Sequence, residues 1–262
     1  MTPGRSWLDA GARLRARRNR SAVILAYHAI ADLPVGSSLR PYSVPPAELI
    51  EQLDLLERAG YEFIDLDALL AALDAARALP KRAVLVTFDD CYDDLRAVVA
   101  PLLAARGIPA LAFAVAGRLG ATNDWDGAAH EPRLGLLDVE GLRDLSRFGI
   151  EVGGHSLTHP RLTELPPARL AAEVAGCHEQ LEAAGLPRPR AFAYPYGAHD
   201  AAVVAAVREA GFHAAFITES GLVSANSDRY RLPRMELRRG DTGTRFRLRL
   251  VSARARAGLR GR

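Results

Sequence analysis

AVLVTFDDCYDD, residues 83–94, joins a short apolar run to four carboxylates and one thiol. The run from Ala83 to Phe88 has the length of a strand and contains β-branched and aromatic residues, so it predicts a buried β-strand. Three explanations are open for the acidic cluster that follows: a solvated start of the next helix, a cysteine nucleophile at Cys91, or one wall of a metal site. The choice depends on what the rest of the chain places near these carboxylates.

Apolar runs of the same kind recur along the chain, and longer patterns typical of amphipathic helices separate them. We expect strands at residues 22–27, 61–64, 83–88, 110–115, 149–154, 190–194 and 213–218. We expect helices at residues 45–60, 66–79, from the acidic cluster to about 105, 138–147, 166–184 and 200–210, and a long loop at 117–136. Alternating strands and helices imply a parallel sheet, which either a closed barrel or an open doubly wound sheet satisfies.

Polar clusters follow three of the expected strands. DD follows the strand at 83–88, GGHSLTH follows GIEV, and PYG follows RAFAY. Barrels of the (β/α) type place their catalytic groups just past the C-terminal ends of their strands, although open α/β sheets also bind ligands at that edge. We therefore favour an α/β fold of the barrel type.

Charge divides the chain into three parts. Residues 1–20 carry six Arg and one Asp, and residues 241–262 carry seven Arg and one Asp. Because the whole chain has a net charge of +3, residues 21–240 carry −8. We expect 21–240 to form one globular domain between two basic tails, 1–20 and 241–262, that are solvated and partly disordered. Such tails could make weak contacts with anionic lipid or nucleic acid.

Targeting signals and cysteine patterns are missing from the sequence. No apolar run is long enough to cross a bilayer, and residues 1–20 contain no uninterrupted apolar segment of the kind found in signal peptides. We therefore expect a cytoplasmic protein, with a membrane-peripheral position as the alternative. Cys91 and Cys177 lie far apart without a CxxC partner, so neither a disulfide framework nor a cysteine-rich zinc site is predicted. The oligomeric state is not predicted.

The segment HSLTHP places His155 and His159 four residues apart. On a helical turn or a tight loop of similar pitch, both imidazoles can point to one side. Two imidazoles and one carboxylate make a three-ligand site with an open position, the pattern of a catalytic metal. Asp89 or Asp90 could supply the carboxylate from the neighbouring strand end. The alternative is a pair of ordinary surface or capping histidines.

Two adjacent aspartates suit a metal-dependent hydrolase, which needs one carboxylate on the metal and another to take a proton from water. Their alternative role is N-capping of the next helix, which we assign to Asp93 and Asp94. Cys91 is a poor nucleophile candidate, because neighbouring carboxylates disfavour its thiolate.

Taken in order, TFDDCYDD, HSLTHP and FAYPYG resemble the polysaccharide deacetylases of the NodB-homology group, carbohydrate esterase family 4. The resemblance extends over most of 21–240 and includes AYHAI and YRLPRMEL. It implies a distorted (β/α) barrel that hydrolyses N-acetyl, or sometimes O-acetyl, groups of a sugar or glycan with Zn²⁺ or another divalent transition metal.

The resemblance also implies roles for single residues. Asp89 is the general base, and the metal ligands are Asp90, His155 and His159. Tyr196 matches the residue whose backbone N–H helps to stabilise the oxyanion, a charge that develops only along the reaction path.

Two further residues are candidate substrate contacts. Pro195 belongs to the same PYG motif. Trp125 lies in the long loop, where it could stack on a sugar or instead anchor the loop by packing.

The chain departs from the family pattern at three places. Cys91 stands where the family usually has Gly, so we expect a backbone there that does not demand positive φ. Ala193 stands where many members carry an arginine that holds the base; Arg231 or Arg234 could replace it, or could make ordinary ion pairs. No late Leu-x-His motif supplies a general acid. His28 in AYHAI is our candidate acid, with a substrate contact or a structural role as alternatives.

The sequence therefore predicts a metal-dependent deacetylase acting on an N-acetylated sugar. A catalytically silent carbohydrate-binding relative, a hydrolase of a non-sugar C–N bond, and nucleic-acid binding through the tails are the alternatives. The sugar and the position of its acetyl group are not predicted.

Overall fold

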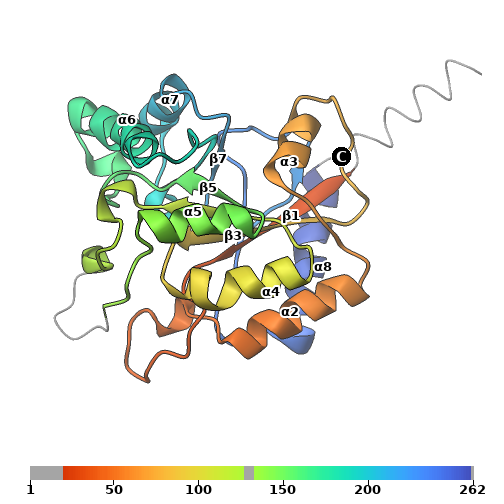
Figure 1. Cartoon of the computed structure of the whole chain (residues 1–262). Coiled ribbons are helices and arrows are strands. Elements are labelled where there is room, and N and C mark those ends of the chain that lie inside the picture. The colour runs from red at the N-terminus through yellow and green to blue at the C-terminus, as the bar shows by residue number, and fades with distance from the viewer. Residues whose placement is uncertain (1–19, 127–132, 261–262) are drawn as a thin grey trace, which may run out of the picture.

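Parallel strands form the centre of the fold (Figure 1). The computed structural model describes residues 20–126 and 133–260. Neighbouring strands pair in the order β7-β6-β5-β4-β3-β1, all in parallel. Their bounds are β1 (Ser21–Tyr27), β3 (Ala83–Asp90), β4 (Ala110–Ala114), β5 (Ile150–Gly154), β6 (Ala191–Ala193) and β7 (Ala214–Phe216).

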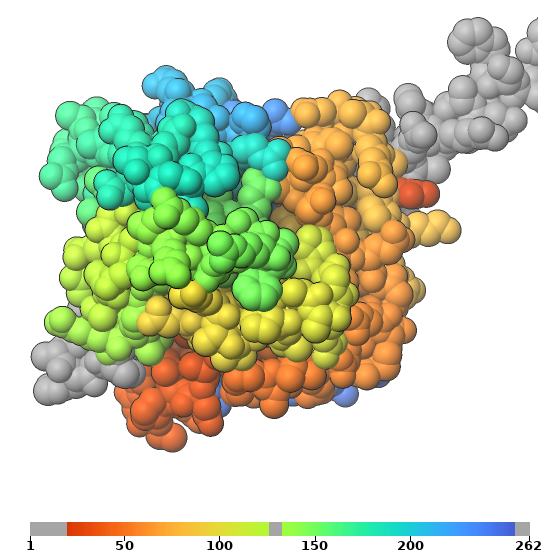
Figure 2. Space-filling view, viewed as in Figure 1, coloured from red at the N-terminus to blue at the C-terminus, as the bar shows by residue number. Residues whose placement is uncertain are grey.

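Helices cover the outside of the sheet, so that the strands visible in Figure 1 are hidden by side chains in the same view of Figure 2. Aspartates cap three of them: Asp65, Asp138 and Asp200 each accept a hydrogen bond from a first-turn N–H. The helices are α2 (Pro46–Arg58), α3 (Leu66–Leu73), α4 (Ala100–Ala105), α5 (Val139–Arg147), α6 (Pro167–Ala183), α7 (Ala201–Glu209) and α8 (Gly243–Arg260). Three short strands complete the set: β2 (Glu62–Phe63), β8 (Val223–Ser224) and β9 (Met235–Glu236).

Residues 232–236 close the sheet between its two ends. On one side, the N–H of Leu232 donates to the carbonyl of Ala215 in β7 at 2.9 Å. On the other side, β9 pairs in parallel with β1, with Met235 opposite Leu25. Because one short segment bridges β7 and β1, the sheet curls into a distorted (β/α) barrel, which confirms the predicted fold.

Both faces of β3 are buried, and each contributes to a different core. Val84 and Val86 pack in the apolar cluster between the sheet and the helices. Ala83 and Leu85 belong to a second cluster, with residues of β4, β6 and β7, that fills the barrel interior. Because side chains alternate along a strand, Asp89 continues the interior row at the end where β3 finishes.

Most predicted helices and strands are present. Some of them end at other residues than predicted, because the local backbone conformation stops the element there. The helix predicted at 66–79 ends at Leu73, and Ala75 has a left-handed backbone with φ of 56° that cannot continue a helix. The helix after the acidic cluster begins as a π-helical stretch, Leu95–Val99, before α4. Parts of the predicted loop 117–136 lie outside the described residues.

The C-terminal segment is not a solvated tail, so the prediction for residues 241–262 is wrong over its described part. Phe246 and Leu250 of α8 are buried in the same core cluster as Leu53 of α2. At the start of the segment, Asp241 is fully buried and pairs with Arg245 at 2.9 Å. Periodic apolar positions on α8 therefore outweigh its charge, and Arg245 and Arg247 of this helix are exposed. The predicted N-terminal tail lies outside the described residues, apart from Arg20.

Within residues 20–126 and 133–260, every helix is too short or too polar to cross a membrane.

Phe246→Ala is expected to lower the free energy of unfolding by about 3–5 kcal/mol, because it empties a fully buried site between α8 and α2. Leu248→Ala is the matched control, since Leu248 lies on the same helix and is 61% exposed; its effect should stay within about 0.5 kcal/mol. Urea denaturation followed by circular dichroism measures both. Equal, small losses would contradict a core role for α8.

Candidate active site

A cavity of ≈ 450 Å³ opens at the C-terminal ends of the strands. It is lined by six residues singled out in the sequence: His28, Asp89, Asp90, His155, His159 and Tyr196. These residues lie far apart in the sequence. The parallel strands bring them to one edge of the barrel, as predicted.

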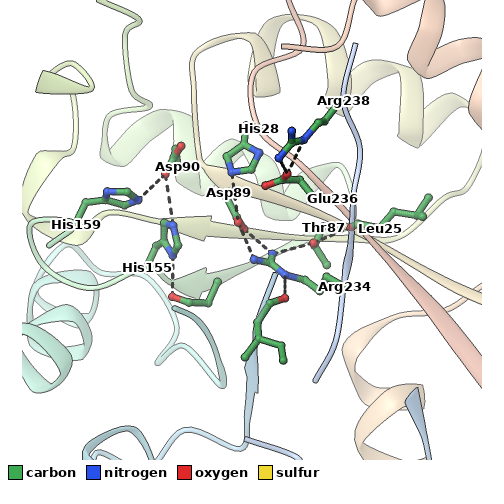
Figure 3. Close-up of polar contacts among 12 residues, drawn as sticks. Leu25, His28, Thr87, Asp89, Asp90, His155, His159, Arg234, Glu236 and Arg238 are labelled. Carbon is green, nitrogen blue, oxygen red and sulfur yellow. Dashed lines mark hydrogen bonds and ion pairs between the residues drawn. The ribbon is translucent and has the colours of Figure 1, made fainter. Parts of the chain in front are cut away.

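Asp90, His155 and His159 form one buried group (Figure 3). The Oδ1 atom of Asp90 lies 3.5 Å from the Nε2 atom of each histidine. The histidines come from a tight loop after β5 and not from a helix. Glu173 of α6 holds this loop by accepting the backbone N–H of Leu157 and Thr158 at 3.0 and 2.8 Å.

The donor set fits a divalent metal ion. The Nδ1 atom of His155 lies 2.7 Å from the carbonyl of Ala193, which as acceptor requires Nδ1–H and leaves the Nε2 lone pair facing Asp90. Within the described residues, Oδ1 of Asp90 is buried and has no hydrogen-bond partner. Two ligand atoms held about 2.1 Å from one tetrahedral ion lie roughly 3.4 Å apart, which matches the observed 3.5 Å.

The protonation states agree with this fit. Burial, and next the neighbouring His155, lower the pKa of His159 well below its usual value, so its ring is neutral and able to ligate. Burial raises the pKa of Asp90, since no arginine or lysine within the described residues pairs with its carboxyl. A cation between these groups would supply the missing positive charge.

Asp89 has a different environment from Asp90, although the two are adjacent. The guanidinium of Arg234 makes a two-pronged ion pair with it, with Nη1–Oδ1 and Nη2–Oδ2 distances of 2.6 and 2.7 Å (Figure 3). Burial favours a raised pKa, but the paired Arg234 outweighs it and holds the pKa of Asp89 well below its usual range. The carboxylate is therefore ionised and fixed in orientation.

Arg234 takes the place of the motif arginine that Ala193 replaces. It is fully buried, and its Nε donates to the carbonyl of Ile217 while Nη1 also contacts Thr87, both at 3.2 Å. Arg231, the other candidate, pairs with Asp228 at the surface at 3.1 Å. The two arginines lie three positions apart in the sequence. Only the path of residues 232–236 through the barrel determines which of them pairs with Asp89.

Cys91 and its neighbour Asp90 have left-handed backbones, with φ of 56° and 70°. The expectation that Cys91 needs no positive φ is therefore wrong, and the chain places a non-glycine residue in a conformation that favours glycine. This turn re-aims Asp90 toward the histidines. Burial, and then Asp90 and Asp89, raise the pKa of the Cys91 thiol well above its usual value, which opposes a nucleophilic role.

Asp93 and Asp94 are the predicted caps of the helix that follows β3. Asp94 lies at the cap position, but its side chain makes no cap hydrogen bond. Its Oδ2 instead accepts the backbone N–H of Ile30, and burial raises its pKa to about 6. Asp93 packs against Gly135, where a Cβ atom would collide with its carboxylate. The second acidic pair therefore connects the loops around the cavity rather than capping the helix.

His28 lies at the cavity wall beside Asp89, and its side chain is 22% exposed. Its Nε2 atom is 3.9 Å from Oδ2 of Asp89, and its ring is in edge contact with Tyr42 at a centroid distance of 5.8 Å. This position is compatible with proton donation into the cavity. The role itself stays a prediction.

Two of the other predicted residues, Tyr196 and Trp125, contact His159. Tyr196 has φ of 58°, and its ring meets that of His159 at 4.7 Å. Trp125 stacks on His159 at 4.6 Å and packs near Leu136, while Pro195 is buried at the start of the turn that carries Tyr196. Neither Trp125 nor Pro195 is among the cavity-lining residues, so their contact with substrate stays a prediction.

Sequence reasoning missed several residues of the cavity wall, among them Tyr42, Arg161, Thr218, Glu236 and Arg238. Arg161 follows the HSLTHP motif directly, and Glu236 and Arg238 follow Arg234. Their closeness to these motifs in the sequence is the one feature that could have indicated a position at the cavity.

Comparisons with known proteins point to one family. The sequence profile of the polysaccharide deacetylase family matches residues 76–215. YxkH of Bacillus subtilis strain 168 is 25% identical over 238 residues, covering 91% of this chain and 79% of that protein. The poly-β-1,6-N-acetyl-D-glucosamine N-deacetylase of Staphylococcus epidermidis is 24% identical, covering 85% of this chain and 81% of its own. The solved deacetylase PplD of Streptococcus pyogenes has the same fold, with a TM-score of 0.74 at 21% identity over 89% of this chain and 97% of that one.

Fold and site thus define a (β/α)-barrel hydrolase with its polar groups gathered at one edge of the barrel. The chain belongs to the polysaccharide deacetylase family. It is a carbohydrate deacetylase, a hydrolase of C–N bonds, which confirms the predicted NodB-type family and enzyme class.

Arg234→Gln is expected to move the acid limb of kcat/KM to higher pH by about one unit or more, because burial without the guanidinium raises the pKa of Asp89. The ion pair stabilises the wild type above the unfolded carboxyl pKa of about 4, and this contribution is lost as pH falls through the lowered folded value. The pH profile of acetate release measures the shift. Arg231→Gln, which breaks the surface pair nearby, is the control; an unchanged limb in a folded Arg234→Gln protein would contradict the role.

Proposed function

We propose that the protein removes the acetyl group from an N-acetylated sugar or polysaccharide, with a divalent metal bound by Asp90, His155 and His159 and with Asp89 as general base. The observation that carries this proposal is the division of labour between two adjacent aspartates: Asp90 faces two histidines, and Asp89 is paired with Arg234. A metal-dependent hydrolase of this type needs one carboxylate on the metal and another that takes a proton from water.

The imidazole and carboxylate donors suit Zn²⁺ or another divalent transition metal. When bound, such an ion supplies Lewis acidity toward the acetyl oxygen and lowers the pKa of water. Asp90 provides the negative charge of the ligand set, and the hydrogen bond from His155 to Ala193 keeps one ring in the ligating tautomer.

The remaining steps belong to side chains of the cavity. Asp89 accepts a proton from the attacking water, and Arg234 keeps its carboxylate ionised and aimed. The backbone N–H of Tyr196 donates to the oxyanion that forms from the acetyl carbonyl. His28 donates a proton to the leaving amine, from a ring nitrogen 3.9 Å from Asp89. The bond broken is the amide C–N bond, and the products are acetate and a free amino sugar.

The first substrate to test is an oligomer of N-acetylglucosamine, because the Staphylococcus epidermidis relative is a deacetylase of poly-β-1,6-N-acetyl-D-glucosamine. A silent carbohydrate-binding protein would need neither Asp89 nor its arginine. Hydrolysis of a non-sugar C–N bond is the alternative, and assays on cyclic ureides and formamides beside the acetylated sugars distinguish the two.

Asp90→Ala and His159→Ala are expected to abolish binding of one Zn²⁺ by the chelator-treated protein, because each removes a ligand. Asp89→Asn should still bind the metal but should release acetate about 10²–10⁴-fold more slowly, through loss of the general base. Calorimetry with Zn²⁺ and an acetate assay on N-acetylglucosamine oligomers measure the two properties separately. Full acetate release by metal-free protein, or by Asp89→Asn, would contradict the proposal.

His28→Gln is expected to slow release of acetate from the N-acetyl sugar by about 10²-fold or more, because the amine leaving group needs a proton. Hydrolysis of 4-nitrophenyl acetate should change little, since its leaving group departs as an anion. Asp89→Asn is the control. Because Asp89 is needed as the base in both reactions, this variant should lose both activities. Equal losses for the two substrates in His28→Gln would point to a substrate contact or a structural role instead.

A further inference from the structure

Three arginines stand in or beneath the cavity, and two of them are neutralised. Arg234 pairs with Asp89 below the floor of the site. Arg238 at the wall pairs with Glu236 at 2.7 Å (Figure 3). Arg161 also lies on the wall. Its side chain makes no ion pair or hydrogen bond with the residues that the structure describes, and only its backbone carbonyl accepts one, from Glu164 at 3.0 Å. Its charge therefore faces the cavity without a carboxylate to balance it.

Arg161 is held in place by an aromatic ring. Its guanidinium carbon lies 4.5 Å from the ring centroid of Tyr196, whose ring in turn meets the metal-ligand candidate His159 at 4.7 Å. Stacking uses the face of the guanidinium and leaves its N–H edge available for other partners. Arg161 is two residues from His159 in the sequence. The N–H edge of its guanidinium therefore lies close to the candidate metal ligands, with only the ring of Tyr196 between them.

We propose that Arg161 binds an anionic group of the substrate, a carboxylate or a phosphate carried next to the acetylated sugar unit. The substrate is thus an acidic acetamido glycan rather than a neutral polymer. This inference rests on the proposed deacetylase function. Arginine suits the role because its planar fork matches both oxyanions with two parallel hydrogen bonds.

A second arginine in the chain gives a matched control. Arg208 stacks on Tyr230 at 4.9 Å in the same manner, but it lies on α7 and does not line the cavity. Arg208→Gln therefore shows the effect of losing a tyrosine-stacked arginine away from the cavity. Only the position of Arg161 at the cavity distinguishes them.

Binding is tested with zinc-loaded Asp89→Asn protein, which does not turn the ligands over. N-Acetylglucosamine 1-phosphate and N-acetylmuramic acid supply a phosphate and a carboxylate, and N-acetylglucosamine is the neutral reference. Calorimetry should show about tenfold or greater preference for at least one anionic probe, as expected for a charge-assisted hydrogen bond. Adding Arg161→Gln should abolish the preference, and adding Arg208→Gln should keep it. A preference that survives Arg161→Gln would belong to the metal and would overturn the proposal, as would equal binding of all three probes.

Turnover gives a second test in the otherwise unchanged protein. Arg161→Gln should lower kcat/KM about tenfold for an acetylated oligosaccharide carrying carboxylates and leave a neutral N-acetylglucosamine oligomer unaffected, and Arg161→Lys should recover part of the loss. Equal losses on both substrates would show that Arg161 only positions Tyr196, which overturns the anionic subsite and leaves the deacetylase intact. Absence of acetate release from every acetylated glycan would refute the deacetylase proposal, while the binding experiment would still decide the role of Arg161.

Discussion

The buried ion pair between Asp89 and Arg234 is the contact on which the site and the barrel both depend. Both side chains are almost completely buried, so either charge alone would carry a large desolvation cost. Arg234 lies in the segment 232–236 that bridges β7 and β1. Closing the barrel therefore also brings in the guanidinium that compensates the buried charge of Asp89.

The same pair explains how two neighbouring carboxylates acquire different chemistry. Asp89 continues the interior row of β3 and meets the arginine there. Asp90 turns out of the strand with φ of 70° and meets two imidazoles instead. Left-handed backbones recur at His159 and Tyr196 on the other loops of the site. Such conformations are costly for non-glycine residues and persist where the surrounding structure holds them in place.

Aromatic packing makes His159 the centre of a second network. Its ring is covered by Trp125 on one side and meets the edges of His155 and Tyr196 on others, and Arg161 covers the outer face of Tyr196. Ring contacts of this kind restrict a ligand side chain without using its nitrogen atoms. Trp125 accordingly packs against the metal-ligand candidate, which makes it at least an anchor of its loop.

The sequence by itself determined the strands, most helices, and the convergence of Asp89, Asp90, His155 and His159, because alternating apolar patterns and motif order are local properties. Tertiary structure decided the rest. It chose Arg234 over Arg231, although the selected partner lies 145 residues from Asp89. It also gave Cys91 its positive φ and converted the arginine-rich C-terminus into α8, packed on α2. Each outcome depends on what faces a residue across the fold. The apolar positions of α8 are periodic in the sequence, but the surface of α2 that buries them is supplied only by the tertiary structure.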